Sequence, residues 1–250
     1  SSGGAPYFST IRQVSNVLSE QVKIAIASSQ ETPEDVLIWV HEQGIEGIFE
    51  DLDLSAEAAD LIPSKTDIVA LDLIGQNSGS EISANQMTIK GKGLRYWDRH
   101  PDYTYGYNLP LLSKRVHDVL TVIAHMRKER PTARISLLGM GPTAGPIAAL
   151  ARVQSGQEVH KLAVNTAGFR FGDLNEFTDP MFLPGAAKYL DMPGVLALAV
   201  AAGSSWVFGE TRSVMDELQI VHKVTGQDYQ LVTGKYGTLK AAFEWLSPYN

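Results

Sequence analysis

The sequence predicts an α/β fold in which a mostly parallel sheet of about six to eight strands is covered by helices on both faces. Three observations support this prediction. Residues 36–40 are a continuous apolar run with the length of a buried strand, and residues 67–73, which are mostly apolar, predict a second buried strand. From residue 111 onward, strand-like and helix-like segments alternate. The chain has 250 residues, which is enough for one large domain with a sizeable core.

The first half of the chain predicts three strands and two helices. Residues 22–27 alternate between polar and apolar side chains, which is typical of a strand at the edge of a sheet. The buried strand 36–40 comes next, followed by a short helix at 55–62 and the buried strand 67–73. Residues 111–127 predict a long amphipathic helix, because apolar side chains recur on one face. These side chains are Leu112, Val116, Val119, Leu120, Ile123 and Met126.

The second half continues the alternation. Strands are expected at 134–138, 159–164, 206–208 and 229–232, and helices at 147–152, 194–202, 212–224 and 238–246. Residues 169–193 are rich in Phe, Asp and Pro and predict an irregular insertion. Residues 80–107 are polar and aromatic with no clear period, and their aromatic side chains predict either a satellite core or a binding surface. These are Tyr96, Trp97, Tyr103, Tyr105 and Tyr107.

Composition narrows the function classes. The net charge of −7 and the pI near 5.4 argue against a general nucleic-acid surface. The chain has no cysteine, which excludes thiol catalysis and thiolate metal sites, and no apolar run approaches the ~18 residues of a membrane span. Histidines lack metal-ligand spacing, so no metal and no cofactor are predicted.

The sequence predicts a single domain over residues 1–250, with residues 1–20 as an extended N-terminal segment. Two alternatives stay open: the chain is part of a longer protein, and its location is secreted or periplasmic.

The most informative motif follows the strand predicted at 134–138. It reads Gly139-Met140-Gly141-Pro142-Thr143-Ala144-Gly145 and precedes a predicted helix. A strand, a sharp glycine turn and a helix form the setting of a nucleophile elbow, whose pattern is G-x-S-x-G. In that pattern Gly139 is the first glycine, Gly141 replaces the serine and Thr143 replaces the last glycine. We interpret this as an elbow that has kept its bend and lost its nucleophile.

With its elements in this order, the chain resembles α/β-hydrolases, and more narrowly the acetyl-xylan-esterase-like and dienelactone-hydrolase-like members found in bacteria. The resemblance covers roughly residues 20–247. It is carried by the elbow and by the segments at 37–44, 104–120, 166–171 and 182–185.

The resemblance implies positions for the catalytic groups, and at most of these positions the chain has a residue that cannot play the expected part. One oxyanion donor would come from the loop 41–44, and the other would be the backbone N–H of Pro142, which proline lacks. The acid position offers Glu210. The base position after the last strand holds Lys235, and no histidine follows His222. Because triad members work as a unit, losing two of them should remove nearly all the chemistry.

Several individual residues are candidates for the site. We expect the Thr143 hydroxyl to lie at the helix N-terminus and to accept hydrogen bonds from its free N–H groups. The alternative is that Thr143 is a displaced nucleophile. His41, Glu42 and Gln43 stand where the resemblance places the oxyanion loop. Two interpretations stay open: these residues line a polar pocket, or His41 is only the polar end of a buried strand. The pocket-binding candidates are His41, Glu42, Gln43, Gly141, Thr143 and Asn165.

The elbow also permits a rival interpretation. Gly139-x-Gly141-x-x-Ala144 fits the dinucleotide fingerprint G-x-G-x-x-G/A and would place a pyrophosphate on the helix N-terminus, giving an NAD(P)-binding protein. That motif requires an acidic residue about 20 positions on, where this chain has Asn165. The motif also follows two buried strands, whereas the nucleotide fold has it on the first.

The sequence therefore favours a non-catalytic hydrolase scaffold that binds a ligand or a partner. The expected partner is a carbohydrate, another protein or an identical subunit, with no nucleic acid and no membrane span. The alternative is an active carboxylic-ester hydrolase of acetyl-xylan-esterase type with a non-standard nucleophile, for which Ser78 and Ser113 are further sources of a hydroxyl.

Overall fold

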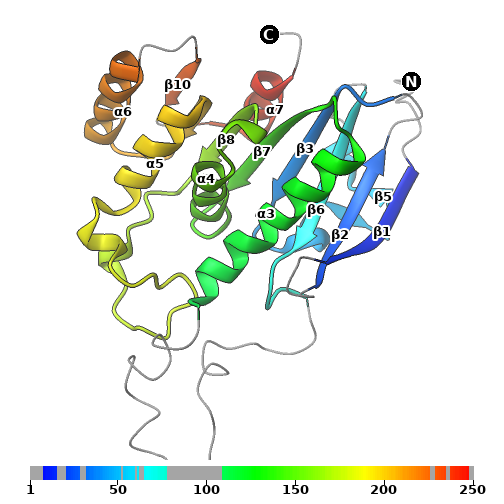
Figure 1. The fold of residues 1–250 in the computed structure, drawn as a ribbon, viewed down its shortest axis with the longest axis horizontal. Coiled ribbons are helices and arrows are strands. Elements are labelled where there is room, and N and C mark those ends of the chain that lie inside the picture. Colours follow the sequence, from blue (N-terminus) through cyan, green and yellow to red (C-terminus); the bar gives the residue numbers. More distant parts are fainter. Residues whose placement is uncertain are drawn as a thin grey trace, which may run out of the picture.

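The computed structural model describes residues 8–15, 21–28, 32–51, 53–59, 61, 65–77, 109–225, 229–234 and 237–247. Eight strands form the main sheet, with helices on both of its faces (Figure 1). The strands are β1 (Phe8–Ser15), β2 (Gln21–Ser28), β3 (Asp35–Val40), β6 (Thr66–Asp72), β7 (Arg134–Met140), β8 (Lys161–Asn165), β9 (Ser204–Phe208) and β10 (Leu231–Gly234). The α-helices are α1 (Ala56–Ala59), α3 (Leu111–Glu129), α4 (Ala144–Ser155), α5 (Asp191–Ala202), α6 (Arg212–Thr225) and α7 (Leu239–Leu246).

The order of strands across the sheet is β1-β2-β6-β3-β7-β8-β9-β10. Strand β2 runs antiparallel to both of its neighbours, and the other neighbouring strands are parallel. This arrangement confirms the predicted α/β fold with a mostly parallel sheet. It also brings the carboxyl ends of β3, β6, β7, β8 and β9 to one edge of the sheet, which is where open α/β sheets place their ligands.

Two hydrophobic cores lie on the two faces of the sheet. Side chains alternate along β3, so that Val36, Ile38 and Val40 join the core under α3, α4, α5 and α6. Leu37 and Trp39 join the opposite core, beside α7. In Figure 1, α3, α4 and α5 lie across one face and α7 lies behind the sheet. The face predicted for the long helix is confirmed, because five of its six apolar side chains are buried and Leu120 packs against them.

Some predictions need correction. Residues 22–27 are not at the edge, because β2 lies between β1 and β6, and all eight residues of β1 pair with it. Strand β1 falls in the segment expected only to be extended, and its Ser, Thr, Arg and Gln side chains hide its strand character. A short hairpin was also missed, formed by β4 (Phe49–Glu50) and β5 (Asp53–Leu54). The aromatic segment 80–107 lies outside the described residues.

Candidate functional site

The bend between β7 and α4 has the shape that the sequence predicts. Gly141 has a φ of +116°, a conformation that side-chain-bearing residues rarely adopt. Its N–H donates a hydrogen bond to the carbonyl oxygen of Asn165 at 2.8 Å, which ties the bend to the end of β8. A Cβ at Gly145 would lie 2.7 Å from the carbonyl carbon of Asn165 and closer still to its oxygen, so glycine also permits the close approach of α4 to β8.

The mouth of this bend is occupied by the carboxylate of Glu42. Its Oε1 accepts hydrogen bonds from the backbone N–H of Thr143 at 2.8 Å and of Ala144 at 3.0 Å. A Cβ at Gly141 would lie 3.0 Å from Cδ of Glu42 and closer still to Oε1. A side chain at this position would therefore require the Glu42 carboxylate to move. The carboxylate also places a negative charge at the positive end of the helix dipole.

This contact corrects the role predicted for Thr143. The Thr143 side chain makes no capping hydrogen bond, although the residue stands at the start of α4. The free N–H groups of the first turn are satisfied instead by Glu42, which comes from a different strand end. A cap supplied from 101 residues away in the sequence leaves no local pattern, so sequence reasoning assigned it to the nearest hydroxyl.

Glu42 is held in place by the loop that follows β6. The side-chain amide of Gln76 donates to the carbonyl oxygens of His41 at 3.3 Å and Glu42 at 3.0 Å. The amide of Asn77 donates to the carbonyl oxygen of Gln43 at 2.8 Å. These hydrogen bonds fix the backbone of the turn after β3, so the glutamate side chain is aimed at α4 by a structured loop.

Asp72 completes this support. It is 9% exposed, and its Oδ1 accepts hydrogen bonds from the Ile45 N–H at 2.9 Å and from the amide of Asn77 at 3.0 Å. Sequence reasoning did not single it out, although an aspartate inside the apolar run 67–73 is a visible signal.

The other candidates on the loop after β3 point elsewhere. The His41 ring lies edge-on to Trp39 with ring centroids 5.9 Å apart, and its Nδ1 accepts a hydrogen bond from the Gln43 N–H at 3.1 Å. Burial lowers the pKa of His41, so its neutral form is favoured. The Gln43 side chain is exposed. Among the hydrogen bonds of the described residues, those from the bend to this loop go to the side chain of Glu42 and not to those of His41 and Gln43.

The predicted acid, Glu210, lies just beyond β9 and is held by an arginine. Its side chain has no exposed surface, and Arg170 donates to Oε1 at 3.1 Å and to Oε2 at 2.6 Å. The hydroxyl of Thr166 donates to Oε1 as well. Hydrogen bonding to Glu210 raises the pKa of Arg170. Both carboxylate oxygens are therefore used in a buried ion pair, in the place where a hydrolase acid would orient a histidine.

Two further predicted site positions are Asn165 and the base position, Lys235. The Asn165 Oδ1 accepts a hydrogen bond from the Ala167 N–H at 2.8 Å, so its side chain stabilises the turn after β8. Lys235 lies outside the described residues. His222 is on α6, and its Nε2 is bonded to the Tyr229 carbonyl oxygen at 2.6 Å. Among the residues that the structure describes, no group of His, Asp and Glu is arranged to hold a metal ion.

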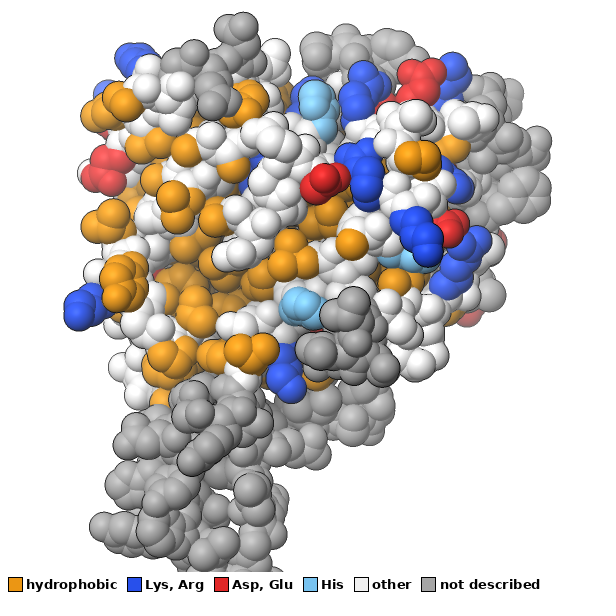
Figure 2. Space-filling model, viewed as in Figure 1, with side chains coloured by type: hydrophobic (Ala, Val, Ile, Leu, Met, Phe, Trp, Pro, Cys, Tyr) orange, Lys and Arg blue, Asp and Glu red, His pale blue; other side chains and the backbone are white. Residues whose placement is uncertain are grey.

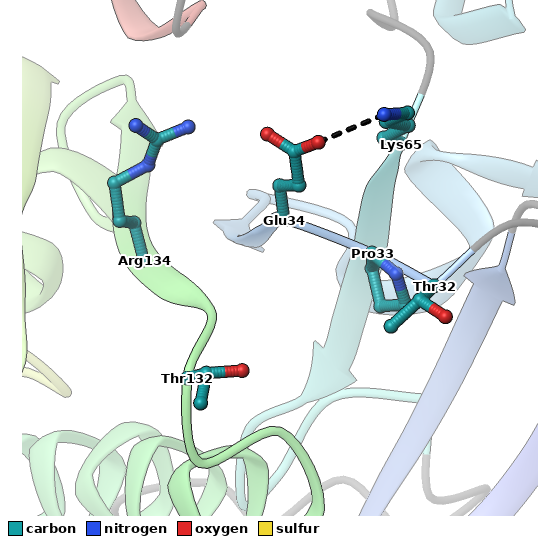
Figure 3. Close-up of a pocket in the computed structure, with 6 residues that line it drawn as sticks. All are labelled: Thr32, Pro33, Glu34, Lys65, Thr132 and Arg134. Carbon is teal, nitrogen blue, oxygen red and sulfur yellow. Dashed lines mark hydrogen bonds and ion pairs between the residues drawn. The ribbon is translucent and has the colours of Figure 1, made fainter.

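A second polar hollow, of about 540 Å³, lies at the opposite edge of the sheet, before β3, β6 and β7 begin (Figure 3). Its charges are paired: Lys65 is 2.9 Å from Glu34, and Arg134 binds both carboxylate oxygens of Asp35 at 2.8 and 2.9 Å. The hydrogen bond from Lys65 lowers the pKa of Glu34. With its charges neutralised and its place at the amino ends of the strands, this hollow is a weaker candidate than the bend.

The sequence predicted the bend and singled out Gly141 and Glu210, but it did not predict that Glu42 covers the bend or that Arg170 binds Glu210. Arg170 carries no local signal, because it is 40 residues from Glu210 in the sequence. Within the described residues, no helix has the length and apolar character needed to cross a membrane.

No protein-family model and no curated protein sequence matches the chain. Solved structures do match: the acylaminoacyl peptidase of Pyrococcus horikoshii has a TM-score of 0.57 at 11% identity, over 92% of this chain and 37% of that one. The chain thus spans little more than a third of the peptidase.

Two further structures give the same result. Oligopeptidase B from Leishmania major has a TM-score of 0.53 at 7% identity, over 96% of this chain and 34% of that one. The glucuronoyl esterase from Solibacter usitatus has a TM-score of 0.56 at 11% identity, over 96% of this chain and 84% of that one. Together with the sheet order and the bend after β7, these likenesses show that the chain has the α/β-hydrolase fold.

Proposed function

We propose that this chain is a hydrolase-fold protein without ester-cleaving activity, and that its role is binding or assembly. One observation carries the proposal: the Glu42 carboxylate fills the mouth of the bend and binds the N–H groups of Thr143 and Ala144. In an acyl-transfer site this space receives the nucleophile and the developing oxyanion. A fixed negative charge there opposes a second one.

The remaining catalytic positions support the same conclusion. Gly141 has no side chain to attack an ester, and Pro142 has no N–H to donate. Glu210 is engaged by Arg170 through both oxygens. The nucleophile and one oxyanion donor are thus absent and the acid is engaged in an ion pair, and these groups act as a unit.

Carbohydrate esters are the substrate class against which the proposal should be tested. The motifs resemble acetyl-xylan-esterase-like proteins, and one structural neighbour, covered to 84% of its length, is a glucuronoyl esterase. We propose that any carbohydrate affinity of this chain is a binding function retained without turnover.

The test measures hydrolysis of 4-nitrophenyl acetate and release of acetate from acetylated xylan, together with labelling by a fluorophosphonate probe. We expect rates equal to those of Thr143→Ala, Ser78→Ala and Ser113→Ala variants, and no labelling. Turnover above these variants, or stoichiometric labelling that disappears in one of them, would establish the alternative of an active ester hydrolase with a non-standard nucleophile.

The dinucleotide alternative has a separate test. A pyrophosphate on α4 would need the N–H groups that Glu42 already binds. We therefore expect no thermal shift with NAD or NADP, whereas a ligand at 100 times its dissociation constant would stabilise the fold by ~2.7 kcal/mol. A saturable shift would refute this expectation.

A further inference from the structure

Helix α5 is apolar around its whole circumference, which is unusual for a helix on a surface. Its inner face, with Met192, Leu196, Ala199 and Val200, is part of the core. Its outer face is also apolar, and Leu198 there is 59% exposed. Helices that are hydrophobic on every side are normally covered on every side. The outer face of α5 therefore has the composition of a covered surface.

A ridge and a hollow lie side by side on this face. The ridge is formed by Tyr189 and Leu190, which are 76% and 78% exposed. The hollow has a volume of about 640 Å³, and its walls are mainly apolar side chains of α5, α6 and the segment before α5, including Leu183, Val195 and Val221. In Figure 2, hydrophobic side chains gather over α5 and beside it, while most charged side chains on that face lie toward its other side.

The backbone of the ridge is built to hold these side chains outward. Leu190 and Asp191 have φ angles of +66° and +54°, which is a strained conformation for residues other than glycine. The Asp191 carboxylate holds it by accepting hydrogen bonds from the N–H groups of Phe171 at 2.7 Å, Gly172 at 2.9 Å and Met192 at 2.6 Å. Strain that the surrounding structure maintains is found mainly at functional sites.

The charge on this surface indicates the kind of partner. Asp191 is the charged residue among those that line the hollow, and its two oxygens are already bound by three N–H groups. The whole chain carries a net charge of −7. Two copies with the same net charge would repel each other at a charged surface, but here two copies can meet without bringing like charges together. A basic or acidic partner would find nothing complementary.

We propose that the surface formed by Tyr189, Leu190, Leu198 and the hollow is the interface of a homodimer, with α5 of one copy against α5 of the other. A two-fold interface must be complementary to itself, and the ridge and the hollow provide both halves on one surface. Tyr189, Leu190 and Leu198 also line the hollow, so the ridge and the hollow form one continuous, mainly apolar surface. Contiguous apolar surfaces of this kind on a monomer are often functional.

This proposal deepens the proposed function, on which it rests for the choice of assembly as the role. The two fail separately. Ester turnover would refute the loss of catalysis and leave the state of association unchanged. A monomer would refute the interface and leave the catalytic assays unchanged.

The test is sedimentation equilibrium of the chain from about 1 to 300 µM. We expect a dimer, and we expect Leu198→Lys to raise its dissociation constant by at least tenfold, because the substitution buries a charge at the centre of the interface. The matched control is Ile11→Lys, an apolar side chain that is 45% exposed on the far edge strand β1 and whose replacement should leave the dimer unchanged.

Cross-linking locates the contact directly. The chain has no cysteine, so Leu198→Cys introduces a single thiol near the proposed two-fold axis, and Ile11→Cys introduces one far from it. A short bis-maleimide should convert Leu198→Cys to a covalent dimer and leave Ile11→Cys monomeric. A monomer throughout the concentration range, or a dimer insensitive to Leu198→Lys, would overturn the proposal, including the case in which this surface covers a different protein.

Discussion

Replacing Glu42 by alanine should destabilise the protein, because it uncovers the first turn of α4. The substitution removes two hydrogen bonds, of 2.8 and 3.0 Å, from the N–H groups of Thr143, which is half-buried, and Ala144, which is buried. Loss of a cap costs about 0.5–2 kcal/mol. Loss of the charge at the helix N-terminus adds about 0.3–1 kcal/mol. We therefore expect the free energy of unfolding to fall by about 2 kcal/mol, which corresponds to a fall in Tm of about 4–8 °C.

The assay is urea unfolding at pH 7, followed by tryptophan fluorescence and circular dichroism. Glu42→Gln retains an acceptor oxygen but loses the charge, so it should lose about half as much as the alanine variant. Glu46→Ala is the matched control, because Glu46 is an exposed glutamate of the same loop, and it should change stability by less than about 0.5 kcal/mol. Equal stability of Glu42→Ala and Glu46→Ala would refute the capping role.

Chemical rescue gives a second measurement on the same variant. The vacated helix N-terminus should accept a small anion, because its N–H groups and the helix dipole favour one. We expect sodium acetate to raise the Tm of Glu42→Ala more than sodium chloride does at equal ionic strength. In the wild-type protein, the two salts should change the Tm by the same amount. A variant that responds to both salts alike would show that the site does not bind carboxylates.

Three further predictions follow from the site. Gly141→Ser should remain inactive and lose stability, since its side chain would meet Glu42 and its φ is +116°, and adding Glu42→Ala should recover part of the loss in urea unfolding; no recovery would contradict the collision. Arg170→Ala should cost about 3–5 kcal/mol, because it leaves the Glu210 carboxylate buried and unpaired, and a loss below ~1 kcal/mol in the same assay would contradict the ion pair. His41→Asn should weaken the pH dependence of unfolding between pH 7.5 and 5. The pKa of His41 is lowered by burial below 6.5, so the unfolded chain binds the proton first and the wild type loses stability as the pH falls through that value; an unchanged pH profile would refute this.

The sequence alone predicted the order of strands and helices from the length and the period of its apolar segments. Residues 36–40 are a continuous apolar run of strand length, residues 111–127 repeat apolar side chains with a helical period, and both form the expected elements. Strand β1 was missed because an edge strand needs few apolar side chains, and the pairing that makes it a strand lies outside its own sequence. The edge position given to 22–27 failed for the same reason.

At the site, the sequence determined which groups the bend itself can offer, and the tertiary structure decided which side chains contact it. Gly141 has no side chain and Pro142 has no backbone N–H, and both facts follow from residue type alone. That Glu42 caps α4, and that Arg170 holds Glu210, depends on loops that meet at one edge of the sheet from 101 and 40 residues apart. A linear pattern carries local propensity, whereas a contact between distant side chains is fixed only when the whole sheet is assembled.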